Sequence, residues 1–354
     1  MSKRAPRTRP TIVDVARAAG VSVATVSNAI NNRRYVEART KLRIDAAAAR
    51  LGYTPNVHAR RLRSTGIGTI GLFSSMPFAI SSHSSRLGFL MEIASTAAVR
   101  ALESGYALLL VPSTPAGPPR FDELAIDGAI VLEPSDDDAC VGQLLKRGVP
   151  LVTIGCQSGA PNALASVDLR SAETAGLLLD HLFDMSCRRV ALMIGAARRT
   201  SYLETEAVYV ERVSAKGVEP LIVRIDESAG EEAAYQNTLV LVRRHRELDG
   251  ILALVDTFAA GALRALDRLG LDVPATVRLA TRYDGRRARE STPPLTSVNL
   301  HLEDVAALAV ELLLERLRSG RSVGRTVLAP PPTLVVRQST AAVTRSARGT
   351  PTRR

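Results

Sequence analysis

The spacing of apolar residues at the start of the chain predicts three short helices. Thr11 and Asp14 have the spacing of a helix-capping pair, and the apolar face that follows them ends at Gly20. Ser22 is placed to cap a second helix. A third periodic run covers residues 38–51 and is followed by a glycine, a common helix stop. Two short helices joined by a tight turn, with a third beside them, predict a helix-turn-helix core.

From residue 66 onward, short apolar runs alternate with amphipathic stretches, which is typical of an α/β fold. The expected strands are residues 69–73, 107–111, 128–132, 151–154, 190–194, 221–225, 250–255 and 277–280. The expected helices are residues 87–103, 171–183 and 259–269. Because the same alternation occurs twice in succession, we expect two similar halves.

The glycines at positions 66, 68 and 71 spell G-x-G-x-x-G, a pattern found in dinucleotide-binding folds. In those folds a strand precedes the pattern and a helix follows it. Here residues 69–73 are themselves the first predicted strand, so we interpret the glycines as a linker and a strand start. The glycine pattern thus suggests a nicotinamide-dependent oxidoreductase as an alternative function. The position of the predicted strand after the pattern opposes this alternative.

Charge separates a basic start from a neutral remainder. Residues 1–65 hold fourteen Lys and Arg against three Asp and Glu, whereas the two signs are equal in number from residue 66 onward. A cationic module on a neutral body is typical of a nucleic-acid reader, because each neutralised phosphate releases condensed counterions. We expect residues 1–10 to form a flexible basic arm and residues 341–354 a disordered basic tail. The alternative is that these basic residues only contact water and bind no nucleic acid.

Five segments of the basic module match a known pattern. They are TIVDVA at 11–16, GVS at 20–22, TVS at 25–27, LGYTPN at 51–56 and ARRL at 59–62. These residues closely resemble the headpiece of LacI/GalR transcriptional regulators. The resemblance implies a helix-turn-helix DNA-binding domain at 11–54, a three-helix headpiece, then a hinge helix and a two-lobe periplasmic-binding-protein-like α/β core. It also implies a homodimer that represses transcription from a double-stranded DNA operator.

The resemblance implies that the helix beginning at Val23 enters the major groove, with Val23, Ala24 and Asn28 at base-reading positions. An Asn side chain can form two hydrogen bonds to adenine, whereas Val23 and Ala24 can only contact thymine methyl groups. We therefore expect sparse direct readout, supplemented by DNA shape. The positions that match phosphate contacts are Thr11, Ser22, Thr25, Ser27, Asn31, Tyr53 and Asn56. Each of these is equally suited to a cap or a turn.

Residues 55–65 are expected to form the hinge helix and a linker. One or two helical turns are not stable alone in water, so a partner must order them. In the family that the chain resembles, this segment folds on the operator and wedges a leucine into the minor groove. Leu62 matches that leucine, and a buried linker residue is the alternative. The positions implied to contact the minor groove are Ala59, Arg60, Arg61, Leu62 and Arg63.

The resemblance continues through the body of the chain. The matching segments are residues 166–168, 187–192, 261–266, 269–274, 296–298 and 333–337. It implies a core at 66–340 with two lobes joined by three crossovers near Asp168, Val298 and Arg325. The first lobe would comprise about 66–167 and 299–325, and the second about 168–298 and 326–340. A small-molecule effector of unknown identity would bind between the lobes.

The cleft positions depart from the family pattern. Gly155 and Thr205 stand where the family has an Asp and a sugar-clamping Arg, and Val255 replaces the Asn of an Asn-Asp pair. We therefore expect a less polar effector, or none. The candidate effector-binding residues are Arg198, Arg199, Tyr202, Thr205, Asp256, Arg282 and Asp284. Each is equally suited to a surface position or an ion pair.

No catalytic motif is present, and neither the five histidines nor the three cysteines have metal-ligand spacing. We expect no enzyme activity, no cofactor and no metal. No apolar run is long enough to span a membrane, and the first ten residues lack the apolar region of a secretory signal, so we expect a cytoplasmic protein. The second alternative is a protein that only binds a small molecule or forms part of a transporter. The cationic module argues against it, because such a protein has no need of a DNA-binding region.

Overall fold

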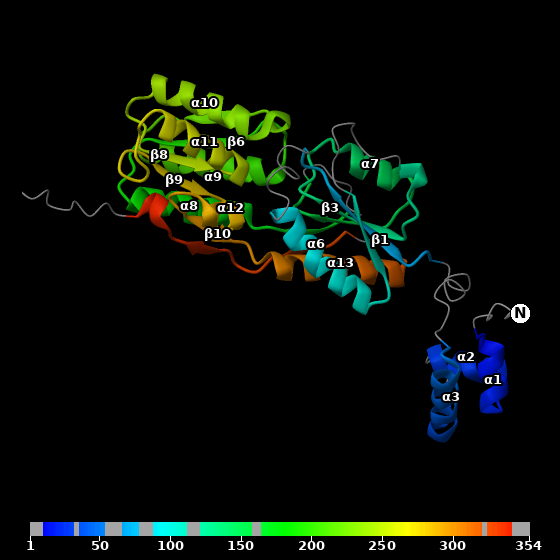
Figure 1. The fold of residues 1–354 in the computed structure, drawn as a ribbon. Coiled ribbons are helices and arrows are strands. Elements are labelled where there is room, and N and C mark those ends of the chain that lie inside the picture. The colour runs from blue at the N-terminus through cyan, green and yellow to red at the C-terminus, as the bar shows by residue number, and fades with distance from the viewer. Residues whose placement is uncertain are drawn as a thin grey trace, which may run out of the picture. The chain divides into compact units, whose positions relative to one another are not determined.

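The computed structural model describes residues 10–31, 35–53, 66–77, 88–111, 121–157, 164–320 and 324–341 (Figure 1). The chain divides into two compact units, one formed by residues 1–67 and the other by residues 68–354. None of the described helices is long and apolar enough to cross a membrane.

The first unit contains the three predicted helices. They are α1 (Ile12–Ala19), α2 (Val23–Asn31) and α3 (Ala38–Leu51). Val15, Val26 and Ile44 contribute one buried side chain from each helix to a small apolar core. Gly20 and Gly52 end α1 and α3 in the left-handed conformation, with φ of 62° and 63°, a conformation that glycine adopts without steric cost. The helix-turn-helix prediction is confirmed.

The second unit begins with a six-stranded parallel sheet in the order β11-β5-β4-β3-β1-β2. Its strands are β1 (Thr69–Ser74), β2 (Ala107–Val111), β3 (Gly128–Leu132), β4 (Leu151–Ile154), β5 (Ala165–Asp168) and β11 (Thr326–Leu328). Helices α6 (Phe89–Glu103) and α13 (Leu302–Ser319) pack together on one face, and α7 (Ala139–Lys146) covers the other (Figure 1). Because both faces are covered, central strands such as β3 are buried throughout.

A second parallel sheet, in the order β7-β6-β8-β9, forms the other lobe. Its strands are β6 (Val190–Gly195), β7 (Ile222–Ile225), β8 (Gly250–Ala253) and β9 (Arg278–Thr281). Its helices are α8 (Ser171–Asp184), α9 (Thr200–Ser214), α10 (Gly230–Arg244), α11 (Asp256–Arg268) and α12 (Arg286–Glu290). Short 3-10 turns lie at Phe121–Glu123, Glu227–Ala229 and Gln338–Thr340. Strands β10 (Ser297–Asn299) and β12 (Thr333–Val335) pair antiparallel beside the lobe. The predicted two-lobe α/β core is confirmed.

Two expectations need correction. Strand β11 pairs with β5 in the first sheet, so the chain leaves the first lobe after Leu328 rather than near Arg325. Residues 326–328 complete the edge of that sheet, which is why they belong to the first lobe. Helix α11 begins at Asp256 rather than at Ala259, which brings a carboxylate to the end of β8. The interpretation of residues 66–71 as a linker and strand start is confirmed, because β1 begins at Thr69.

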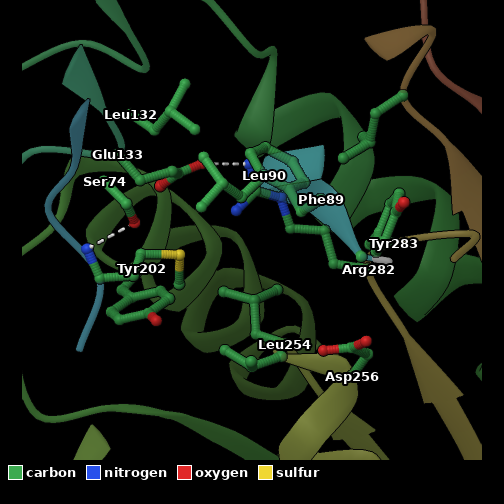
Figure 2. A pocket seen from close by; sticks show the side chains of 14 residues that line it. Ser74, Phe89, Leu90, Leu132, Glu133, Tyr202, Leu254, Asp256, Arg282 and Tyr283 are labelled. Carbon is green, nitrogen blue, oxygen red and sulfur yellow. Dashed lines mark hydrogen bonds and ion pairs between the residues drawn. The ribbon is translucent and has the colours of Figure 1, made fainter. Parts of the chain in front are cut away.

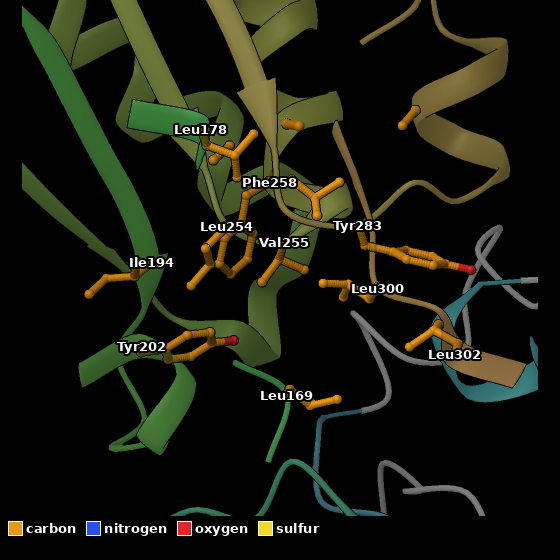
Figure 3. Packing of buried hydrophobic residues seen from close by; sticks show 14 of the residues in the cluster. Leu169, Leu178, Ile194, Tyr202, Leu254, Val255, Phe258, Tyr283, Leu300 and Leu302 are labelled. Carbon is orange, nitrogen blue, oxygen red and sulfur yellow. The ribbon is translucent and has the colours of Figure 1, made fainter. Parts of the chain in front are cut away.

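The apolar core continues from one lobe into the other. Figure 3 shows Leu254 and Phe258 packed inside the second lobe, with Leu169, Leu300 and Leu302 following where the chain crosses between the lobes. All five side chains are buried and belong to one apolar cluster that includes residues of both sheets. The crossovers therefore hold the carboxyl ends of the two sets of strands facing each other, the usual position of a ligand site in α/β folds.

Candidate DNA-binding helix and effector cleft

The first turn of α2 presents two of the three predicted base-reading residues to solvent. Val23 is 38% exposed and Ala24 is also exposed, whereas Asn28 is half-buried one turn further along. None of these side chains contributes to the apolar core of the headpiece. The start of the helix is thus open for contact with a partner.

Two of the proposed phosphate-contacting hydroxyls also cap helices. Ser22 Oγ accepts a hydrogen bond from the Thr25 backbone N–H at 3.1 Å and lies 2.8 Å from Thr25 Oγ1. Thr11 Oγ1 donates to Asp14 at 2.7 Å and accepts a weaker bond from the Asp14 backbone N–H. At α1 the backbone N–H and the hydroxyl of Thr11 both donate to the Asp14 carboxylate, so the cap there is satisfied within the protein. At α2 the Ser22 and Thr25 hydroxyls lie together at the helix N-terminus, an arrangement that suits an anion.

The structure describes some of the other predicted DNA-contacting residues. Ser27 and Tyr53 are half-buried, and Tyr53 packs against the headpiece core. The backbone of Asn31 ends α2, but its side chain lies outside the described part of the structure. The predicted DNA-contacting residues that lie outside the described part of the chain are Asn56, Ala59, Arg60, Arg61, Leu62 and Arg63.

A cavity lies where the strands of the two lobes end (Figure 2). The centre of a water-sized molecule can occupy about 60 Å³ of it. It is lined by Ser74, Met76, Gly88, Phe89, Leu90, Leu132, Glu133, Tyr202, Leu254, Val255, Asp256, Arg282, Tyr283 and Leu300. Most of these side chains are apolar, so the few polar groups decide what the cavity can hold.

Glu133 connects the two lobes through this cavity. Its carboxylate accepts hydrogen bonds from Arg282 Nη2 at 2.6 Å and from Ser201 Oγ at 2.5 Å. Glu133 is 3% exposed and has a φ of 46°, a left-handed conformation that is unusual for a residue other than glycine. Because Glu133 follows β3 whereas Arg282 follows β9, this buried ion pair joins the facing strand ends directly.

A second buried polar group lies behind the cavity wall. Arg199 forms an ion pair with Glu227 at 2.8 Å and donates to the carbonyl oxygens of Ser75, at 3.1 Å, and Glu133. Tyr202 Oη donates to Glu227 at 2.6 Å. Burial opposes the charge on Arg199, but the hydrogen bonds and charge of Glu227 outweigh it and raise the pKa of the guanidinium. Burial, with the Glu227 charge second, raises the pKa of Tyr202 well above its ordinary value.

Asp256 is the other acidic group in the cavity. It lies at the start of α11 below Tyr283 in Figure 2, and its side chain is 12% exposed. Burial raises the pKa of Asp256, and Arg287 at 3.7 Å offsets this only in part. Across the cavity the rings of Phe89 and Tyr283 meet edge to face at 5.5 Å, and Tyr283 Oη donates to Glu92 at 2.5 Å.

The structure brings together some of the predicted effector residues and separates others. Tyr202, Asp256 and Arg282 line the cavity, and Arg199 lies behind them. Three others have different partners: Arg198 is exposed and pairs with Asp136, Thr205 donates to Ser201 O at 2.8 Å, and Asp284 pairs with Arg337 at 2.6 Å. Since these three do not line the cavity, we remove them from the effector set.

Sequence reasoning missed Glu133 and Glu227. A signal for Glu133 was available, because it directly follows the apolar run 128–132, and ligand sites in α/β folds lie at the carboxyl ends of strands. Among the residues that the structure describes, no group of three or more His, Cys, Asp or Glu is arranged to hold a metal ion.

A helix-turn-helix module on the same chain as a two-lobed core with a cavity at its strand ends defines a class of DNA-binding regulators with a sensor domain. The model of the bacterial regulatory proteins of the lacI family matches residues 11–56, and that of the periplasmic binding protein-like domain matches residues 179–340. The chain therefore combines a DNA-binding domain of the lacI family with a periplasmic binding protein-like domain.

Full-length relatives and solved structures support the same assignment. The HTH-type transcriptional repressor PurR of Erwinia tasmaniensis is 27% identical over 341 residues, covering 94% of this chain and 97% of the relative. PurR of Serratia proteamaculans is 28% identical over 344 residues, with the same coverage. The Lac repressor dimer bound to operator and the anti-inducer ONPF has a TM-score of 0.72 at 25% identity, covering 95% of this chain and 100% of its own. The transcriptional regulator CelR in complex with cellobiose has a TM-score of 0.67 at 26% identity, covering 94% and 100%.

Proposed function

We propose that this chain is a transcriptional repressor that binds a pseudo-palindromic operator as a homodimer and responds to a small molecule in the cavity between its lobes. The observation that carries the proposal is the exposed first turn of α2, inside a segment that holds the whole net charge of +11. Relatives are named as repressors, and the Lac repressor structure is a dimer on its operator. Such a protein acts in the cytoplasm, where operator DNA is accessible.

Base readout rests on Val23, Ala24 and Asn28. The half-buried Asn28 amide is the one of the three that can hydrogen-bond to a base edge, whereas the exposed Val23 and Ala24 offer apolar contact. Hydroxyls at the helix N-termini, such as those of Thr11 and Ser22, contact phosphates and fix the register. The operator therefore includes an adenine opposite Asn28 in each half-site.

The hinge completes DNA recognition. The family resemblance supports a role for Leu62 as the wedge in the minor groove, with Arg60, Arg61 and Arg63 beside the phosphate walls. Such a wedge requires two hinges on one duplex, and hence a dimer. The free energy of inserting the wedge depends on how easily the central base step unstacks. This dependence adds sequence specificity without direct contact to a base.

Helix α6 supplies the surface for dimerisation. Met91, Val99 and Leu102 are 38%, 55% and 73% exposed on this helix, although its other side packs on the first sheet and on α13. Three apolar side chains turned to solvent on one helix favour a partner. A second copy is the partner that the function needs, because one small helix-turn-helix makes too few contacts for specific binding.

The cavity provides the coupling to a ligand. Opening the lobes breaks the buried Glu133–Arg282 pair and the Ser201 hydrogen bond, whereas closing them restores both. A ligand shifts this equilibrium only by its difference in affinity for the two states. Tyr202, Asp256 and Arg282 contact the ligand, and Arg199 holds the wall behind it.

The proposal is tested by selecting bound duplexes from random oligonucleotides with the purified full-length protein. We expect an inverted repeat whose half-sites are about one helical turn apart, or a multiple of it. A variant carrying Asn28→Ala should select the same spacing with relaxed sequence at one position of each half-site. Recovery of duplexes with no shared sequence would contradict the proposed function.

A further inference from the structure

The cavity contains an unequal set of charges. Among its described lining residues, Glu133 and Asp256 are acidic and Arg282 is basic. Glu133 and Arg282 neutralise each other at 2.6 Å. The partners of Asp256 are weaker: Arg287 Nε lies 3.7 Å from its Oδ2, and Thr257 Oγ1 donates a long hydrogen bond to its Oδ1 at 3.4 Å. Arg287 also donates to Glu231 at 3.1 Å, so its charge is shared. One buried carboxylate is therefore left with weak compensation, an arrangement that costs free energy in an apolar site.

The surroundings of Asp256 favour a positively charged partner. Leu254, Val255 and Leu300 form apolar walls, and the rings of Phe89 and Tyr283 lie on the same cavity. The hydrogen bond of Tyr283 Oη to Glu92 uses the polar tip of the side chain and leaves its ring as the contact surface. Aromatic faces attract cations, and the attraction strengthens when water is excluded.

The same groups disfavour other classes of ligand. An anion would add a second unbalanced negative charge to a buried site. A sugar needs several free polar partners, but Glu133, Tyr202 and Tyr283 already use their polar atoms in hydrogen bonds within the protein. The centre of a water-sized molecule can move through only about 60 Å³ of the cavity, so the ligand is small.

We propose that the cavity binds a small, mostly apolar molecule bearing a single protonated amine, with Asp256 as its counter-ion. This inference rests on the proposed effector role of the cavity. The aromatic pair would contact the body of the ligand, while the Glu133–Arg282 pair stays intact beside it. The ammonium group would replace water around Asp256 and bring the lining to electrical neutrality.

Three molecules of similar size and different charge test the proposal: benzylamine, benzyl alcohol and benzoate. Each is titrated calorimetrically into the full-length protein at pH 7, alongside two variants. Asp256→Asn removes the counter-ion, and Asp267→Asn makes the same change at an exposed site near the other end of α11. We expect benzylamine to bind more tightly than the other two, and its Kd to rise about tenfold or more in Asp256→Asn but not in Asp267→Asn.

Three results would overturn the proposal: benzyl alcohol or benzoate binding as tightly as benzylamine, an unchanged benzylamine Kd in Asp256→Asn, or no binding of benzylamine at all. DNA binding is measured on the same preparation without any of these molecules. If sequence-specific DNA binding is present while benzylamine fails, the proposed ligand class is wrong and the repressor function stands. If specific DNA binding is absent too, the proposed function itself fails.

Discussion

The carboxylate of Glu133 accepts a hydrogen bond from Arg282 Nη2 at 2.6 Å and thereby joins the end of β3 in one lobe to the end of β9 in the other. Both side chains are buried, at 3% and 8% exposure. Removing one partner of such a pair leaves the other charge buried and uncompensated.

We therefore expect Glu133→Gln to lower the free energy of unfolding by about 3 kcal/mol, measured by urea denaturation. The control is Glu290→Gln, which breaks an exposed pair with Arg286 at 60% exposure on both sides. That change should cost only about 0.5 kcal/mol. Similar losses for the two variants would show that the buried pair does not stabilise the closed lobes.

Asp256 predicts a dependence of stability on pH. Because burial raises the pKa of this carboxyl above its unfolded value of 3.8, the folded state binds the proton more tightly, and stability falls as pH rises through that window. Asp256→Asn removes this loss. The variant should therefore be more stable than the parent at pH 7, and the difference should shrink as pH falls toward 4. A difference independent of pH would contradict the raised pKa.

Dimerisation is tested on the exposed apolar residues of α6. Leu102→Glu places a charge in the proposed interface and should give a monomer in sedimentation experiments at micromolar concentration, while the fold is retained. Leu145→Glu on α7 is the matched control, since Leu145 is also exposed, at 38%. A dimer that survives Leu102→Glu but not Leu145→Glu would place the interface on the other face of the first lobe.

The hinge is tested by comparing two affinities of one variant. Leu62→Ala should weaken binding to the selected operator by about 10-fold or more, because each unstacked step involves a few kcal/mol. Binding to random DNA depends on phosphate contacts and should change little. Equal losses on both kinds of DNA, measured by fluorescence anisotropy, would exclude a wedge.

The fold was largely predictable from the sequence, because buried parallel strands appear as apolar runs such as 128–132 and 190–194. Helices α7, α9, α10, α12 and α13 were missed, and α9 and α10 show one reason. Their apolar residues are interrupted by charges, and each buries only part of its surface against the second sheet and the neighbouring helix. Strand β11 was assigned to the wrong lobe because three residues with little buried surface carry no signal of their partner, β5.

The cavity was predictable only in part. Tyr202, Asp256 and Arg282 were selected from their positions, and they do line it. Glu133 was missed because a glutamate after a strand is usually exposed, and its burial depends on Arg282, far away in the sequence. Asp284 was selected by resemblance to the family, but Arg337 and Ser297 hold its carboxylate instead. Pairings between distant residues cannot be inferred from local patterns.

The central claim is that residues 23–28 read base edges, while the surrounding Lys and Arg residues supply affinity that does not depend on the DNA sequence. Its most direct test is the ratio of Kd values for the selected operator and for a scrambled duplex at one moderate salt concentration. We predict a ratio of about 1,000 or more for the parent protein, reduced about 10-fold or more by Asn28→Ala. Equal affinity of the parent for both duplexes would contradict the account.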